Sequence, residues 1–266
     1  MDIHATQPLF AAGGALQFAI KAATPEGKTT VCVLLVLSLF SWTIIITKLR
    51  QLLIARKYAK RFFTSYNSTR DPLDIKRSGN EFEGAPAYGL YSRGAEELDY
   101  QLKTHPITVK GRKRISRASF EAVKVVLEEA AAFEAMALEK GMIVLSTAVA
   151  GGPFIGLLGT VWGVMETFAG IAKANSASLT AMAPGVAGAL IATVVGLLVA
   201  IPAMFGYNFM VTTIRHITQE LDGFATRLAT QIEHEYVDSR PLAEEIADAL
   251  QASERQAKQP AEAVVK

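Results

Sequence analysis

The sequence predicts an all-α membrane protein with three transmembrane helices, the second and third extended far into the cytoplasm as a long antiparallel hairpin. Three observations lead to this fold class. Half of the 266 residues are apolar, and charged residues crowd some windows while others carry none. In the charged segments the apolar residues recur at three- and four-residue steps. Segregated charge is typical of membrane proteins, and this spacing is that of amphipathic helices.

Residues 1–28 form an N-terminal outer or interfacial segment. The apolar stretch 9–20 is well short of the roughly 20 residues that a transmembrane helix needs. No Lys or Arg precedes it, which disfavours a signal peptide. We expect this stretch to lie along the membrane surface.

Residues 29–48 form the first predicted transmembrane helix, which carries no charge from Thr29 to Thr47. The only cysteine of the chain, Cys32, lies in this run. A single cysteine excludes an internal disulfide and a cysteine-cluster metal site. We interpret Cys32 as a small buried hydrophobic residue rather than a redox group.

Basic residues give the orientation. Two lysines precede the first span, and one lies in the loop 173–184. Six basic residues and no acidic one follow the first span: Lys48, Arg50, Arg56, Lys57, Lys60 and Arg61. Because basic residues concentrate on the cytoplasmic side, we expect the N-terminus outside and the C-terminus in the cytoplasm.

Residues 49–140 form a predicted cytoplasmic helical domain, interrupted by turn residues between positions 69 and 87. No Gly or Pro lies between Gly111 and Gly141, so we expect this helix to run straight into the second span. A solvated helix start, or contact with anionic lipid head groups, explains the basic cluster better than nucleic-acid binding does. The cluster comprises Arg112, Lys113, Arg114 and Arg117.

Residues 141–172 and 185–211 form the second and third spans, joined by an outer loop at 173–184. The second span contains one charged residue, Glu166, and the third contains none. The helical pattern continues over 212–237, which we interpret as a cytoplasmic extension of the third span. The tail, 238–266, is polar.

Small residues line one face of each of these two spans. Such stripes let membrane helices approach closely, so tight packing is the simplest interpretation. The stripe of the second span comprises Gly152, Gly156, Gly159, Gly163 and Gly170. In the third span we assign Gly188, Gly196 and Pro202 to packing; the stripe itself also holds Gly185, Ala189, Ala192, Ala200 and Ala203.

Thr160 and Thr193 lie at the edges of these stripes. Because the helices are antiparallel, both threonines fall about 13–17 Å below the outer loop, near the bilayer midplane. One interpretation is a polar girdle that offers partners to a proton or to water. The other is that each hydroxyl bonds only to its own helix backbone, as membrane threonines commonly do.

Two segments resemble the second- and third-span motifs of the ExbB/TolQ/MotA proton-channel family, and of its ExbB/TolQ branch in particular. They are Pro153–Met165 (PFIGLLGTVWGVM) and Ala183–Pro202 (APGVAGALIATVVGLLVAIP), the latter followed by Tyr207 and Asn208. The resemblance implies a homopentameric ring in the bacterial inner membrane around single-span partners of the ExbD/TolR/MotB type. The partner would supply a protonatable Asp, with Thr160 and Thr193 facing it, and a TonB/TolA-like protein would be a further partner.

The family pattern has a glutamate where this chain has Gly188. Glu166 lies about 9 Å outward of Thr160, and Gly188 about 7.5 Å outward of Thr193, so the two positions have similar depth. A carboxylate within a span is a candidate functional residue. Glu166 either replaces the missing glutamate in the proton path or extends to the outer membrane interface.

No catalytic constellation, phosphate loop or cofactor motif is present in the sequence, and we expect neither an enzyme nor a metal site. The four histidines are scattered along the chain, at positions 4, 105, 216 and 234. The resemblance implies a channel or stator subunit that couples proton flow to mechanical work on an envelope protein. A passive membrane scaffold and a flagellar- or gliding-type stator remain as alternatives. The sequence leaves open the system that is powered, the choice of H⁺ or Na⁺, and the subunit ratio.

Overall fold

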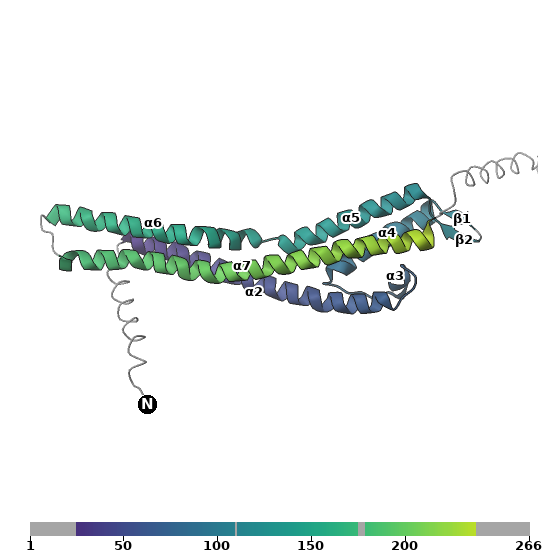
Figure 1. Ribbon diagram of the computed structural model, residues 1–266, viewed down its shortest axis with the longest axis horizontal. Coiled ribbons are helices and arrows are strands. Elements are labelled where there is room, and N and C mark those ends of the chain that lie inside the picture. The colour runs from purple at the N-terminus through teal and green to yellow at the C-terminus, as the bar shows by residue number, and fades with distance from the viewer. Residues whose placement is uncertain (1–24, 110, 175–178, 238–266) are drawn as a thin grey trace, which may run out of the picture. The chain divides into compact units, whose positions relative to one another are not determined.

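A computed structural model describes residues 25–109, 111–174 and 179–237 of the chain (Figure 1). Most of the predicted N-terminal segment, the middle of the outer loop and the tail lie outside these residues. Within them the chain forms six helices and two strands. In chain order these are α2 (Pro25–Asn67), α3 (Asp74–Ser78), α4 (Pro86–Thr104), β1 (Ile107–Val109), β2 (Arg112–Arg114), α5 (Arg117–Glu139), α6 (Met142–Ala174) and α7 (Leu179–Tyr236).

Three of these helices are long and apolar enough to cross a membrane. The most apolar windows of α2, α6 and α7 have mean hydropathies of 2.3, 1.8 and 2.4. Among the described residues, the only strands are the short antiparallel pair β1 and β2, which the sequence did not predict. The predicted all-α membrane fold with three spans is confirmed.

The second span does not continue the preceding helix, so that prediction was wrong. Helix α5 ends at Glu139 and α6 begins at Met142. Gly141 between them has a φ of 88°, a left-handed conformation that glycine adopts readily and that commonly ends a helix. The buried ammonium of Lys48 donates to the carbonyl of Leu138 at 2.9 Å, which satisfies part of the last turn of α5.

Two other helices are longer than the spans they contain. Helix α2 has 43 residues and extends well beyond position 48. Helix α7 has 58 residues, so the third span and its predicted extension over 212–237 form one helix. Cys32, expected to be buried, is exposed on α2.

The chain divides into two compact units. The first contains Met1–Lys60, Gly84–Pro86 and Phe133–Glu220, and therefore the apolar parts of all three long helices. Its core is built from small and aliphatic side chains of these helices, among them Leu34, Leu52, Leu145, Ala192 and Met210. This unit contains all the predicted proton-path residues.

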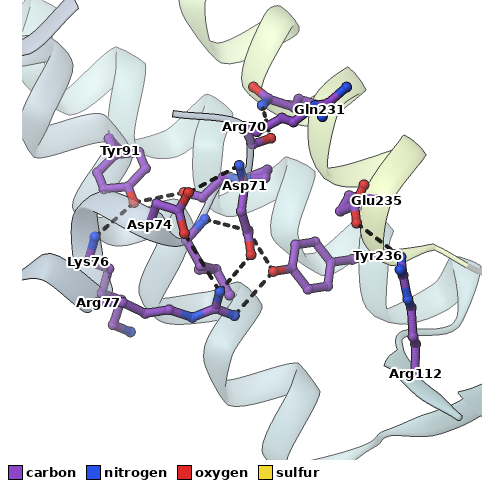
Figure 2. A network of polar contacts seen from close by, with 12 residues as sticks. Arg70, Asp71, Asp74, Lys76, Arg77, Tyr91, Arg112, Gln231, Glu235 and Tyr236 are labelled. Carbon is purple, nitrogen blue, oxygen red and sulfur yellow. Dashed lines mark hydrogen bonds and ion pairs between the residues drawn. The ribbon is translucent and has the colours of Figure 1, made fainter. Parts of the chain in front are cut away.

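The second unit contains Arg61–Glu83, Ala87–Ala132 and Leu221–Lys266. Phe62 is fully buried in it, with its ring centroid 5.5 Å from that of Phe224 and 5.6 Å from that of Tyr91. Figure 2 shows the polar network that attaches the 70–77 segment to the end of α7. In this network the Tyr236 hydroxyl and the Arg77 guanidinium each donate to Asp71 at 2.6 Å.

Candidate functional site: the seam between α6 and α7

Glycines bring the backbones of α6 and α7 into direct contact in the first unit. A Cβ atom placed on Gly156 would lie 2.8 Å from the Ala192 carbonyl oxygen and 3.0 Å from the Thr193 Cα. A Cβ atom on Gly196 would lie 2.7 Å from the carbonyl oxygen of Gly152. Neither position has room for a side chain, because the atoms it would meet belong to the backbone.

Three other glycines of the α6 stripe, Gly152, Gly159 and Gly163, also face atoms of α7, and one glycine of the stripe is an exception. Gly152, Gly159, Gly163 and Gly188 are buried, and Pro202 is half-buried. Gly170, the exception, is exposed and has no atom within 4 Å of the position that a Cβ would occupy. The close packing along the glycine stripe of α6 therefore runs from Gly152 to Gly163.

Thr160 and Thr193 meet within this seam. Their hydroxyl oxygens are in direct contact. Both lie within hydrogen-bonding distance of the same acceptor, the Gly156 carbonyl oxygen, at 3.1 Å from Thr160 and 3.3 Å from Thr193. Each hydroxyl has one proton to donate and two lone pairs. The cluster therefore satisfies its own donors and keeps acceptor capacity for a further donor.

Helix α2 packs against the same seam. A Cβ atom placed on Gly159 would lie 2.6 Å from Ala192 Cβ and 2.9 Å from Thr30 Cγ2, so α2 and α7 both cover this glycine. Further along, the Ile45 side chain lies against Gly206 of α7. These two contacts fix the relative position of α2 along the pair.

Glu166 lies beyond the packed part of the seam. Its side chain is exposed, although the helical wheel placed it on the glycine stripe, whereas Gly188 is buried. Gly163 lies against Ala189, and Thr167 against Gly185. Glu166 is therefore level with a point between Gly185 and Ala189 on α7, close to the predicted depth of Gly188. The structure does not bring its carboxylate into the Thr160–Thr193 cluster.

A hollow of about 470 Å³ opens at the other end of the same helix pair. It combines apolar side chains with polar and charged ones, so both water and an apolar group fit its lining. The lining residues are Glu139, Met142, Ile143, Ser146, Tyr207, Val211, Ile214, Arg215, Thr218 and Gln219. Sequence reasoning missed this hollow, whose lining includes residues on both sides of the helix break at Gly141.

The seam has polar atoms but no ionisable side chain at its centre. Thr160, Thr193 and Gly156 supply hydroxyl and carbonyl oxygens only. In the described part of the chain, no three His, Cys, Asp or Glu residues are grouped as metal ligands would be. Such a site can hydrogen-bond to a proton carrier or to water, but an acidic group must come from elsewhere for a proton to be held.

Comparisons with known proteins agree with this description. Residues 99–223 match the model of the MotA/TolQ/ExbB proton channel family. The Tol-Pal system protein TolQ of Haemophilus influenzae is 30% identical over 213 residues, which are 79% of this chain and 90% of the relative.

Two further relatives are biopolymer transport proteins ExbB. The protein of Xanthomonas campestris pv. campestris (strain B100) is 35% identical over 205 residues, covering 70% of this chain and 78% of the relative. The protein of Pseudomonas putida is 33% identical over 181 residues, covering 68% of this chain. The chain spans about half the length of that relative, 52%.

Proposed function

The chain belongs to the MotA/TolQ/ExbB proton channel family, and from this premise we propose that it is the channel or stator subunit of an ExbB/TolQ-like motor driven by the proton-motive force. Its three apolar helices make it a multi-pass membrane protein. We place it in the bacterial inner membrane, with the N-terminus outside and the C-terminus in the cytoplasm, because of the basic residues after the first span.

The contact between Thr160 and Thr193 carries this proposal. It puts two hydroxyls and one backbone carbonyl where the α6 and α7 backbones are in direct contact. Polar groups inside a membrane are costly unless they are hydrogen-bonded, and those that face the interior of a helix bundle commonly mark ion or proton pathways. The cluster has acceptor capacity but no acid, so it suits a proton-carrying side chain that a second protein brings to it.

The partner that fits is a single-span ExbD/TolR-like protein with a protonatable Asp. We propose that several copies of this chain, five by resemblance to the family, surround such partner helices. Protonation changes the charge of the Asp and so its preference for the polar cluster over the apolar wall, which moves the partner relative to the ring. Two of the relatives are biopolymer transport proteins and a third belongs to the Tol-Pal system. A TonB/TolA-like envelope protein is the load that we propose.

Glu166 is a second element of the proposed path. Its exposed side chain, close in level to Gly188, would face a neighbouring subunit or the partner helix and accept protons from the outer side. We expect Glu166→Gln to lower proton flux through the complex, and Glu166→Gln with Gly188→Glu to recover part of it. Unchanged flux in Glu166→Gln would mean that this carboxylate only extends to the membrane interface.

Co-isolation tests the proposed partnership. The chain, tagged and extracted from its native membrane in mild detergent, is expected to retain a single-span protein with an Asp in its span, identifiable by mass spectrometry. A preparation with no other membrane protein that is nonetheless fully active would contradict the proposal.

The alternative of a passive scaffold makes a different prediction. A scaffold holds partner helices without conducting, so its function survives collapse of the membrane potential and the pH gradient. A proton-driven motor stops. Crosslinking between the chain and its partner, measured before and after addition of a protonophore, therefore distinguishes the two. A crosslinking pattern that does not change supports the scaffold.

A further inference from the structure

Helix α2 carries a basic patch within the first unit, formed by Leu53, Arg56 and Lys57. The Leu53 side chain is 58% exposed, and Arg56 and Lys57 are exposed one turn further along the helix. Residues three and four apart on a helix are surface neighbours, so both cations flank the same apolar side chain. No acidic residue lies between Gly27 and Arg70. Beyond its first turn, α2 therefore offers these cations no carboxylate of its own.

Helix α5 carries an acidic patch within the second unit, formed by Val125, Glu128 and Glu129. The Val125 side chain is 61% exposed, and both glutamates are exposed one turn later. The order of residues is that of the basic patch: an apolar side chain, then two like charges at the third and fourth positions after it. The nearby ammonium of Lys124 lies 3.1 Å from the carboxylate of Glu121, so it is engaged outside the acidic patch.

The four charged residues of the two patches have no partner within the part of the chain that the structure describes. Arg56, Lys57, Glu128 and Glu129 form no ion pair and no side-chain hydrogen bond there. A single exposed apolar residue is ordinary on a protein surface. An apolar centre with charges of one sign beside it is the arrangement of a small protein interface, which has an apolar core and a polar rim.

The basic patch lies further along α2 than lipid head groups extend. Counted from the predicted end of the first span at residue 48, Arg56 and Lys57 lie about 12 and 14 Å along the helix. The head-group layer on each side of the hydrocarbon core is only about 5–8 Å thick. Arg50, about 3 Å from the same point, is level with that layer. A protein surface that presents carboxylates is therefore the better counterpart for Arg56 and Lys57.

We propose that the basic patch of one copy of this chain binds the acidic patch of a neighbouring copy, and that this contact joins adjacent subunits on the cytoplasmic side. This assignment rests on the proposed function, in which several copies surround the partner helices. The opposite charges select which faces meet, and the two apolar side chains form the centre of the contact. Two different patches of one chain make a head-to-tail contact, which closes into a ring when the rotation between copies allows it.

Crosslinking between copies tests this contact. In a Cys32→Ala background, Leu53→Cys and Val125→Cys are placed in the same chain, within the complete complex and its partner in native membranes. A short bismaleimide spans the roughly 8–10 Å between the axes of packed helices. A head-to-tail contact gives a ladder of dimers, trimers and larger species on a denaturing gel. Either cysteine alone gives no species above a dimer.

Charge reversal shows whether the two patches bind each other. We expect the yield of the ladder to fall about tenfold in Arg56→Glu/Lys57→Glu, because like charges then face each other across the contact. The same fall is expected in Glu128→Lys/Glu129→Lys. The two reversals combined restore opposite signs, so we expect them to recover most of the ladder.

A second double substitution controls for the change in net charge. Lys113→Glu/Arg117→Glu alters the charge by the same amount as the reversal on α2, at exposed positions outside both patches. It should leave the ladder unchanged. Because basic residues close to a span also help to orient it, the reversal on α5 keeps the test independent of membrane insertion.

The outcomes separate this contact from the proposed function. A full ladder in both reversals, or a loss that the combination does not restore, would overturn the contact. If the ladder stays full and the basic reversal lowers the amount of anionic phospholipid that co-purifies, the basic patch belongs to the membrane surface and the contact is wrong. A full ladder from a complex that conducts no protons would refute the proposed function and leave the contact intact. Wild-type proton flux without any ladder would overturn the contact alone.

Discussion

At the residue scale, the shared acceptor of Thr160 and Thr193 explains why two hydroxyls are placed where helix backbones touch. Either hydroxyl alone would be satisfied within its own helix. In the seam both hydroxyls lie within hydrogen-bonding distance of the Gly156 carbonyl oxygen, and they also contact each other. The polarity of the seam therefore depends on both residues and on the glycine that lets them approach.

Replacing either threonine by valine keeps the side-chain volume and removes the hydroxyl. We expect Thr160→Val and Thr193→Val complexes to assemble normally and to lose about tenfold in proton flux, which corresponds to one hydrogen bond of roughly 1.4 kcal/mol. Thr212→Val is the control, because Thr212 is an exposed threonine of α7 that bonds its own helix. Full activity of both variants at normal expression would exclude the polar cluster from the path.

A second residue-scale prediction concerns Asp71 in the second unit. Burial raises the pKa of its carboxyl group, but hydrogen bonds from the Leu73 backbone, Tyr236 and Arg77 together lower the pKa by more than burial raises it, so the net pKa lies below the usual 3.8. Because the pKa of Asp71 is lower in the folded state than in the unfolded state, its carboxylate stabilises the fold fully at a pH above the unfolded-state pKa. This stabilisation is lost as the pH falls through the folded-state pKa.

We therefore expect Tyr236→Phe to destabilise the segment 70–77 by about 1 kcal/mol at neutral pH, with the difference from wild type shrinking below about pH 4. Hydrogen exchange of peptides covering this segment measures the effect. Tyr100→Phe, at an exposed tyrosine, is expected to behave like the wild type. A difference that grows in acid would contradict this assignment of the network.

The residues of this site were predictable to the extent that a repeating pattern marks them. The glycine stripe and the depth of the two threonines followed from helical periodicity. Gly170 and Glu166 share the wheel position of that stripe but lie beyond the packed part of the seam, which periodicity alone does not reveal. Lys48 was missed because its contact with the last turn of α5 depends on which helices pack together, not on its own segment.

At the element scale, the seam between α6 and α7 depends on a few glycines that face backbone atoms. Gly156 faces the carbonyl of Ala192, so a methyl group there forces the helices apart. Gly151, five residues earlier on α6, has no atom within 4 Å of its Cβ position. The two glycines have the same helix propensity and different surroundings, which makes them a matched pair.

We expect Gly156→Ala to lower stability by about 1–3 kcal/mol through overpacking. Gly151→Ala should be neutral or stabilising by up to about 1 kcal/mol, because alanine favours the helix. Thermal unfolding in detergent, followed by circular dichroism, compares the two variants. Equal effects would show that helix propensity alone determines the result and that the close approach contributes nothing.

Elements were predicted best where composition is extreme. The three apolar spans and the continuation of α7 to Tyr236 followed from length and periodicity. The break between α5 and α6 did not, because a single glycine within an apolar helix is often tolerated. Tertiary contacts accompany this break: Gly141 has a left-handed backbone conformation, and the Lys48 ammonium from α2 donates to the last turn of α5. The β1–β2 hairpin is three residues per strand, too short to leave a pattern.

At the scale of the whole molecule, the orientation of the three spans determines which segments face the cytoplasm. We expect 49–140 and 238–266 in the cytoplasm and 173–184 outside. Since Cys32 is exposed on α2, labelling requires a Cys32→Ala background. In that background, Ser176→Cys should react with an impermeant thiol reagent in intact spheroplasts. Ser78→Cys should react with the same reagent only after lysis. The reverse pattern would overturn the orientation.

Proton conduction is the property on which the proposed function depends. The direct measurement is the rate of acidification inside liposomes that contain the chain and its co-isolated partner, under an imposed pH gradient and membrane potential. We expect acidification well above that of protein-free liposomes, and a large reduction when Thr160 and Thr193 are both replaced by valine. Acidification no faster than in protein-free liposomes, with the complex intact, would contradict the assignment of this chain as a proton channel subunit.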